Sequence, residues 1–201
     1  MISVIKIKLA DINDYEDILK IYEKYINDTL ITFECKVPTI EEFANRLDNI
    51  QKTFPLFVCK MENKVAGYAY ISRFRDREAY DWTVESSIYI SSKYHGMNIG
   101  KAMYHALIEI SKISGYKNLI GVVTMPNIKS EKLHAHFGFE EVGILKNVGN
   151  KNGNWADVKY YSLKLSEYNL NPEKPKPISE IMNSNELSNI LKIAEQMINI
   201  N

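Results

Sequence analysis

The stretch Trp82–Ala102, WTVESSIYISSKYHGMNIGKA, combines three local patterns that together decide the fold. Residues 82–90 are rich in aromatic and β-branched residues, as strands are. Two glycines and an asparagine in 95–100 break this pattern, and apolar residues return at helical spacing from Ile99 onward. A strand that leads through a glycine turn into a helix can hold an anion, because backbone N–H groups and the helix dipole favour negative charge there. The alternative is a tight connection that binds nothing.

The glycine turn matches neither of two well-known phosphate-binding motifs. No Gly-Lys-Ser/Thr closes it, as in a P-loop, and the G-x-G-x-x-G spacing of dinucleotide-binding proteins is absent. The pattern therefore predicts an anion without naming the molecule.

The turn resembles the acyl-CoA pyrophosphate loop of the GCN5-related N-acetyltransferases (GNAT), whose pattern is Gln/Arg-x-x-Gly-x-Gly/Ala. The corresponding residues here are His95-Gly96-Met97-Asn98-Ile99-Gly100, followed by Lys101. His95 replaces the usual Gln or Arg, and Asn98 replaces the usual middle Gly. Asn is one of the few residues besides Gly that adopt a positive φ, so the loop can still form.

A narrower resemblance, to the phosphinothricin/methionine-sulfoximine acetyltransferase family, covers about residues 2–165. It rests on several motifs that occur in one order: Thr32-Phe33-Glu34, Phe74-Arg75-Asp76-Arg77, Ala79-Tyr80-Asp81-Trp82-Thr83-Val84-Glu85, Pro126-Asn127, Leu133-His134, Gly138-Phe139 and Trp155-Ala156-Asp157-Val158. The resemblance implies acetyl-CoA as co-substrate, a small amino acid or its analogue as acceptor, direct transfer in a ternary complex, a homodimer and no metal.

The same resemblance implies which residues bind the two substrates. Those expected to bind acetyl-CoA are Ile88, Tyr89, Ile90, His95, Gly96, Met97, Asn98, Ile99, Gly100, Lys101 and Asn127. Those expected to bind the acceptor are Phe33, Glu34, Arg75, Arg77, Tyr80, Trp82 and Thr83. Arg73, Arg75 and Arg77 lie close together, and Arg suits bidentate binding of a carboxylate or phosphinate. A solvated surface is the alternative for this cluster, and the sequence does not choose between Arg75 and Arg77.

Glu85 and His134 are the candidate catalytic residues. Acetyl transfer needs a base for the amine, and Glu85 lies among apolar and aromatic neighbours in a predicted central strand, where burial would raise its pKa. The alternative for Glu85 is a carboxylate at an exposed strand edge. His134 occupies the place at which the wider superfamily often has a tyrosine that protonates the leaving thiolate. A histidine can act as acid or base near neutral pH, but it can also be structural, so the choice of base stays open.

Hydrophobic periodicity predicts the order β-α-α-β-β-β-α-β-α-β-β, which is an α/β fold with one mixed sheet and helices on both faces. This agrees with the GNAT fold, whose two central strands splay to admit the pantetheine arm. We expect this domain to cover 1–166, with a proline-rich linker at 167–183 and an amphipathic helix at 184–201. The stripe of this C-terminal helical tail must be packed on its own domain or on a partner, and we expect it to bridge or buttress a homodimer. It consists of Leu187, Ile190, Leu191, Ala194, Met197 and Ile198.

Composition limits the other possibilities. The chain has 201 residues, 25 Lys+Arg and 25 Asp+Glu, so the zero net charge gives no electrostatic case for nucleic acid or an anionic membrane. No apolar run approaches a membrane span, and no signal peptide is recognisable. Cys35 and Cys59 lack metal-ligand spacing and indicate reduced thiols in a cytoplasmic protein. Alternative functions are a protein or peptide N-acetyltransferase and a non-catalytic acyl-CoA-binding module.

Overall fold

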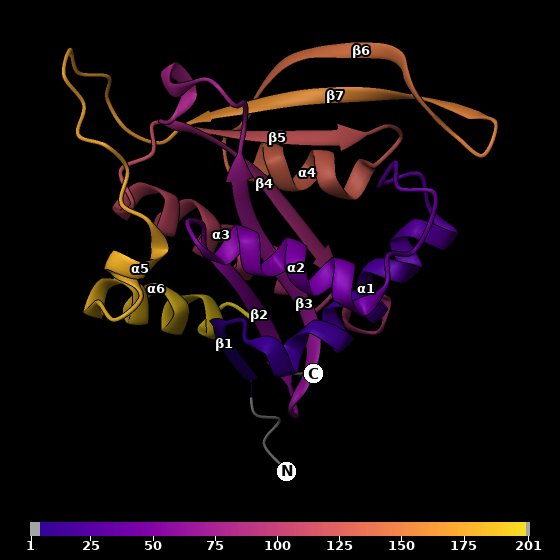
Figure 1. The fold of residues 1–201 in the computed structure, drawn as a ribbon, viewed down its shortest axis with the longest axis horizontal. Helices are drawn as coiled ribbons and strands as arrows, with labels where there is room; N and C mark the ends of the chain where they lie inside the picture. The colour runs from indigo at the N-terminus through magenta and orange to yellow at the C-terminus, as the bar shows by residue number, and fades with distance from the viewer. Residues whose placement is uncertain (1–4, 200–201) are drawn as a thin grey trace.

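The computed structural model describes residues 5–199 of the chain. Up to residue 165, the predicted order of helices and strands is confirmed (Figure 1). The elements are β1 (Ile5–Leu9), α1 (Tyr15–Asp28), α2 (Ile40–Gln51), β2 (Leu56–Met61), β3 (Lys64–Arg73), β4 (Thr83–Ile90), α3 (Ile99–Ile113), β5 (Asn118–Thr124), α4 (Ile128–His136), β6 (Glu140–Lys151), β7 (Asn154–Lys164), α5 (Ile178–Ile181) and α6 (Asn185–Gln196).

The strands form one mixed seven-stranded sheet in the order β1-β2-β3-β4-β5-β7-β6. The β4–β5 pair is parallel, and the other neighbours are antiparallel. β4 and β5 pair from Thr83 with Asn118 to Ser86 with Gly121 and then separate, as their directions in Figure 1 show. The predicted splay is therefore confirmed, and it begins directly after Ser86.

Helices cover both faces of the sheet because the central strands are apolar on both sides. In β2, Leu56 and Val58 pack in the cluster under α1 and α2, whereas Phe57 and Cys59 pack in the cluster under α3. Alternate residues of a strand point to opposite faces, so a continuous apolar run serves two cores. Each fully buried side chain of this size contributes about 1.5–3 kcal/mol to the stability of the sheet.

Residues after β7 pass across the end of β4 and then along α3. Trp82 donates its indole N–H to the Glu173 carbonyl (2.8 Å), and the Lys176 N–H donates to the Ser114 carbonyl just beyond α3 (2.7 Å). The stripe of α6 then packs on α3 and β1, with Leu187, Ala194 and Ile198 buried. This stripe is therefore covered by its own domain, where the sequence favoured contact with a second copy. Residues 200–201 of the expected helix lie outside the described residues.

α6 also covers one edge of the sheet. The Glu195 carboxylate accepts a hydrogen bond from the Ile7 N–H of β1 (2.7 Å). An edge strand otherwise offers unpaired backbone groups to another chain, so this contact protects β1. Within residues 5–199, no helix is long and apolar enough to span a membrane.

Candidate active site

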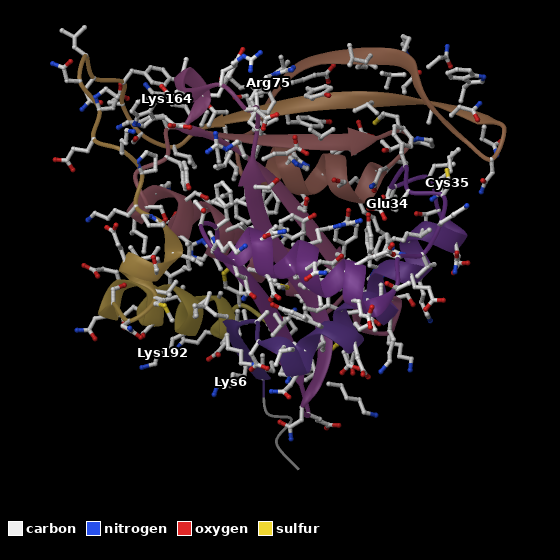
Figure 2. All side chains as sticks on the ribbon, viewed as in Figure 1. Lys6, Glu34, Cys35, Arg75, Lys164 and Lys192 are labelled. Atoms are coloured by element: carbon white, nitrogen blue, oxygen red, sulfur yellow. The ribbon has the colours of Figure 1, made fainter. Side chains whose placement is uncertain are left out.

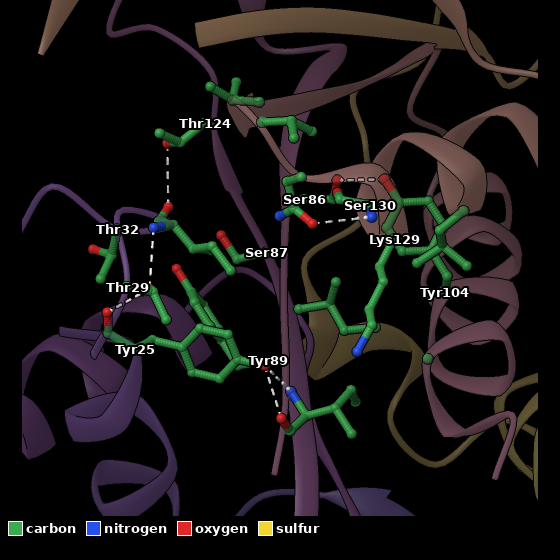
Figure 3. Close-up of a pocket in the computed structure, with 18 of the residues that line it drawn as sticks. Tyr25, Thr29, Thr32, Ser86, Ser87, Tyr89, Tyr104, Thr124, Lys129 and Ser130 are labelled. Carbon is green, nitrogen blue, oxygen red and sulfur yellow. Dashed lines mark hydrogen bonds between the residues drawn. The ribbon is translucent and has the colours of Figure 1, made fainter. Parts of the chain in front are cut away.

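A cavity of about 1000 Å³ opens where β4 and β5 separate. Its walls come from the second half of β4, the end of β5, the start of α3, α4, and α1 with the loop that follows it. Figure 3 shows Tyr25, Thr29 and Thr32 on one side of β4, and Ser86, Tyr104 and Ser130 on the other. The divergence of two strands thus joins both faces of the sheet in one cavity.

The start of α3 forms one end of the cavity. Asn98 is its N-cap and adopts the left-handed conformation (φ 63°), as the sequence comparison with the pyrophosphate loop requires. The Asn98 side chain makes no capping hydrogen bond, and no acidic residue occurs in the first turn. The first N–H groups of a helix have no acceptor within it, so this end favours an anion. Six of the seven predicted loop residues line the cavity: His95, Gly96, Asn98, Ile99, Gly100 and Lys101. Met97 instead packs against the core.

The backbone of β4 faces the cavity beyond the last pair with β5. At Ile90, the Tyr25 hydroxyl bonds both to the carbonyl (2.7 Å) and to the N–H (3.2 Å), and His95 Nε2 lies 3.2 Å from the same carbonyl. The polar groups of Ile90 are therefore already paired within the protein. Strand backbone groups alternate in direction, so Ile88 presents its N–H and carbonyl to the same side as Ile90. Ile88 and Tyr89 both line the cavity beside Ile90.

Glu85 lines the cavity from β4, opposite Ser72 of β3 and Ile120 of β5. Its side chain is half-buried, and no residue within the described range 5–199 forms a hydrogen bond or an ion pair with its carboxylate. Burial raises the pKa of Glu85 above the usual carboxyl value. A carboxylate without a partner and with a raised pKa is suited to accept a proton from a bound molecule.

His134 is buried (4% exposed) and belongs to a hydrogen-bonded chain that reaches the cavity. Its Nδ1 lies 2.8 Å from the Ser130 carbonyl and must donate to it, which leaves Nε2 of the neutral ring as an acceptor. The Tyr104 hydroxyl lies 2.9 Å from this Nε2 and 2.9 Å from Ser86 Oγ. Burial lowers the pKa of His134, so the ring is neutral near pH 7. His134 Nε2 therefore accepts the proton of the Tyr104 hydroxyl and holds this hydroxyl at the edge of the cavity.

Gly121 makes room for this arrangement. A Cβ atom on Gly121 would lie 2.1 Å from His134 Nε2, so the imidazole occupies the space that any side chain would need. Sequence reasoning missed Gly121, Ser86 and Tyr104. They come from three different elements, and no spacing in the sequence indicates that they meet.

The loop after α1 forms the other side of the cavity. Phe33 lines it, and its ring lies against Gly149 of β6. Glu34 does not line the cavity, because it pairs with Arg46 and accepts from the Tyr22 hydroxyl (2.9 Å). Lys151 of β6 is 2% exposed and donates to the carbonyls of Thr29 (2.7 Å) and Thr32 (2.8 Å). No pattern in the sequence singles out this lysine, which fastens the loop to the β6–β7 hairpin.

The β3–β4 loop lies apart from the cavity. Figure 2 shows Arg75 well separated from Glu34, and Arg75 lies over the ring of Phe74 (5.0 Å) with its side chain exposed. Trp82 is bonded to the C-terminal segment, and Thr83 accepts from the Asn118 side chain (3.2 Å). This part of the predicted acceptor site does not line the cavity; the residues concerned are Arg75, Arg77, Tyr80, Trp82 and Thr83.

Asn127 lines the cavity as the N-cap of α4, where its side-chain oxygen accepts from the Ser130 N–H (3.2 Å). A search of residues 5–199 finds no group of three or more His, Cys, Asp or Glu residues that could hold a metal ion.

Comparison with known proteins shows the family to which the chain belongs. The model of the acetyltransferase (GNAT) domain matches residues 7–159. The chain is 30% identical over 177 residues to the phosphinothricin N-acetyltransferase of Streptomyces viridochromogenes, covering 88% of this chain and 94% of that one. It is 30% identical over 173 residues to the L-methionine sulfoximine/L-methionine sulfone acetyltransferase of Pseudomonas aeruginosa, covering 85% and 98%.

A solved structure is similar over nearly the same length. The phosphinothricin acetyltransferase of Sinorhizobium meliloti, crystallised in complex with acetyl-CoA, superposes with a TM-score of 0.80 at 32% identity. The superposition covers 86% of this chain and 94% of that one.

Proposed function

Because this chain belongs to the GNAT acetyltransferase family and is an N-acetyltransferase, we propose that it acetylates the α-amine of a small amino acid or amino-acid analogue. Phosphinothricin and methionine sulfoximine or sulfone are the acceptors to which its relatives point. The observation that carries the proposal is the Glu85 carboxylate, which faces the cavity without a partner and has a raised pKa. An α-ammonium group needs such a base before its nitrogen can attack.

In the proposed reaction, the ammonium group of the acceptor loses two protons, and the leaving thiolate takes up one. Glu85 removes the first, which frees the nitrogen lone pair to attack the thioester carbonyl. The C–N bond forms as the C–S bond breaks. Glu85 passes the first proton to solvent and takes the second from the nitrogen, and the thiolate takes one proton, so that one proton is released in all. The Tyr104 hydroxyl, held between Ser86 and His134, turns its proton from His134 Nε2 to sulfur and then regains a proton from solvent. No residue of the chain is acylated, so transfer is direct.

The residues proposed for acetyl-CoA fit its chemistry. Residues 95–101, which are the loop before α3 and the start of its first turn, bind the pyrophosphate. Backbone N–H groups and the helix dipole both favour an anion there. The Ile88 backbone and the Asn127 side chain bind the amides of the pantetheine arm. The cavity lies in the gap between β4 and β5, which suits a long, narrow arm.

The acceptor enters from the side of α1, where Phe33 lines the cavity that Glu85 also lines. For the acid group of the acceptor, Arg75 or Arg77 is the proposed partner. Both side chains are exposed, and neither forms an ion pair with another residue of the described range. Each would have to move with the β3–β4 loop to reach the cavity. If one of them does, Arg→Ala raises the KM for the acceptor far more than the KM for acetyl-CoA.

The remaining proposals concern the oligomeric state, the domain boundaries and the cellular location. The proposed active unit is a homodimer, because the edge strand β6 and its neighbour β7 expose large apolar side chains: Val142, Ile144, Leu145, Val148 and Trp155. The proposed catalytic domain is 1–166, followed by the linker 167–183 and the helical tail 184–201. We place the enzyme in the cytoplasm, consistent with the free thiols of Cys35 and Cys59.

Release of free thiol from acetyl-CoA tests the function. Purified protein is assayed with single amino acids, phosphinothricin, methionine sulfoximine and methionine sulfone, and with peptides that carry the preferred amino acid at their N-terminus. We expect turnover with a free amino acid or analogue and little with the peptide. A preference for the peptide would support a protein N-acetyltransferase instead. Acetyl-CoA binding without turnover on any acceptor would contradict the proposal and favour a binding module.

A further inference from the structure

The C-terminal tail ends against the loop that is proposed to hold the pyrophosphate. The Asn199 N–H donates a hydrogen bond to the Met97 carbonyl (3.1 Å). Ile198, just before it, is buried in the same core cluster against which Met97 packs. The linker before the tail bonds to the Ser114 carbonyl through the Lys176 N–H, so the C-terminal segment is fastened near both ends of α3. This contact belongs to a segment that lies outside the 7–159 match to the acetyltransferase domain.

Anchoring the Met97 carbonyl fixes the next backbone donor. A trans peptide unit is planar, so the carbonyl of Met97 and the N–H of Asn98 point in opposite directions. With the carbonyl turned to the tail, the Asn98 N–H is held away from the tail. Asn98 lines the cavity, whereas Met97 does not. One hydrogen bond from the tail thereby sets the orientation of a peptide unit at the mouth of the proposed pyrophosphate site.

The loop has reason to need such an anchor. Gly96 and Asn98 both have positive φ (86° and 63°), and Asn98 is not a glycine. The left-handed conformation is less favourable for Asn than for Gly, and the Asn98 side chain adds no capping hydrogen bond. A contact from outside the loop offsets this cost and keeps the loop in its binding conformation before the ligand arrives.

We infer that Asn199, through its backbone N–H, is a positioning residue that preorganises the pyrophosphate loop for acetyl-CoA. The inference rests on the proposed function, since it assigns the loop to the same ligand. The tail acts on acetyl-CoA binding alone. Residues 184–199 form no hydrogen bond with Glu85 or Tyr104.

A matched pair of variants at one position isolates the hydrogen bond. Asn199→Pro removes the N–H, whereas Asn199→Ala keeps it and removes only an exposed side chain. We expect Asn199→Ala to behave as wild type. Asn199→Pro raises both the Kd and the KM for acetyl-CoA about two- to tenfold, the range expected for one net hydrogen bond. The kcat and the KM for the acceptor stay within twofold of wild type.

Loosening of the tail in general requires its own control. Glu195→Ala breaks the contact with β1 and leaves Asn199 in place. If Asn199→Pro lowers the melting temperature, it is compared with Glu195→Ala, and only Asn199→Pro is expected to change the KM for acetyl-CoA. Hydrogen exchange at residues 97–101 gives a readout independent of activity, and exchange there is expected to rise in Asn199→Pro.

The outcomes separate the two proposals. If wild type does not bind acetyl-CoA, the proposed function fails. If wild type binds it and the Pro and Ala variants have equal Kd and equal exchange at 97–101, the function stands and this inference fails. Equal KM changes in Asn199→Pro and Glu195→Ala would also overturn it, since a merely structural role predicts that result.

Discussion

Gly121 leaves the space that the His134 imidazole occupies. A single methyl group added at this position therefore tests whether the placement of His134 matters for stability and catalysis. In Gly121→Ala, the new Cβ would lie 2.1 Å from Nε2, so the ring must move and lose its bond to Tyr104. We expect the free energy of unfolding to fall by about 1–3 kcal/mol, as for overpacked cores, and kcat to fall with it. Denaturant unfolding and thiol release measure the two effects.

Gly143→Ala is the matched control, because nothing lies within 4 Å of a Cβ placed there and its φ needs no glycine. It should leave both quantities unchanged. If Gly121→Ala kept full stability and kcat, the tight packing of His134 would be irrelevant to catalysis.

Glu85 provides the second prediction at this scale. In Glu85→Gln, kcat is expected to fall by about 10²–10⁴-fold, the usual contribution of a general base, while the Kd for acetyl-CoA stays the same. Isothermal titration and thiol release give the two values. Unchanged turnover would remove Glu85 from the mechanism.

The role of Glu85 also predicts the direction in which the activity of wild type changes with pH. The folded-state pKa of Glu85 lies above the ordinary value of 4.5, and the base acts only when ionised. Activity should therefore fall as pH drops through a pKa higher than 4.5, and this limb should be absent from the residual activity of Glu85→Gln. An acid limb at or below 4.5 would show that Glu85 is not the titrating base.

Single residues also show where sequence reasoning succeeds and where it stops. Asn98 could be predicted, because a loop pattern that calls for glycine and a residue type that accepts positive φ coincide at one position. Tyr104 could not, because its hydroxyl meets His134, which lies 30 positions further along the chain, through a contact between α3 and α4. The contact of Trp82 could not be predicted either: its neighbours resemble an acceptor site, and its indole is bonded to the C-terminal segment.

Among the elements, the β6–β7 hairpin holds the loop 29–33 through Lys151. The ammonium group is buried and donates to two carbonyls, so Lys151→Met leaves both acceptors unpaired. We expect this variant to lose about 2–4 kcal/mol of stability. The KM for the acceptor should rise, because Phe33 on the same loop lines the cavity. Lys146→Met is the control, since Lys146 is exposed and pairs with Asp157 across the hairpin. Equal losses in both variants would contradict the role of Lys151.

Lys151 also predicts a pH effect on stability. Burial lowers the pKa of Lys151 below its usual 10.5, so the unfolded chain keeps this proton to a higher pH than the folded protein. The unfolded state then binds more protons between the two pKa values, and the free energy of unfolding rises with pH across that window. The contribution should be absent in Lys151→Met. Chemical denaturation of both proteins at several alkaline pH values measures the difference.

For the molecule as a whole, the order of helices and strands could be predicted from hydrophobic periodicity, and the splay of β4 and β5 from the family resemblance. Both depend on local sequence patterns, such as the alternating residues of β2 that pack in two cores. The destination of the tail did not follow. The stripe of α6 shows only that it must be covered, and the surface that covers it is formed by α3 and β1, far away in the sequence.

Assembly supplies the prediction at this scale. Leu145 is about half exposed on the edge strand β6, so Leu145→Arg should disrupt a homodimer formed through this strand. Ile12→Arg is the control, because Ile12 is exposed near the opposite edge of the sheet, just after β1. Light scattering should give a dimeric mass for wild type and Ile12→Arg and a monomeric mass for Leu145→Arg. A monomeric wild type would contradict the proposed dimer outright.

The contact of α6 with β1 has a consequence for synthesis on the ribosome. β1 is the first strand of the sheet to emerge, and α6 emerges after every strand. The outer edge of β1 therefore stays uncovered until α6 has been synthesised. During that interval the nascent sheet offers a bare edge to chaperones and to neighbouring nascent chains. Slowing of elongation after β7 would prolong this exposure, and the yield of the protein in cells should depend on codon usage in its final segment.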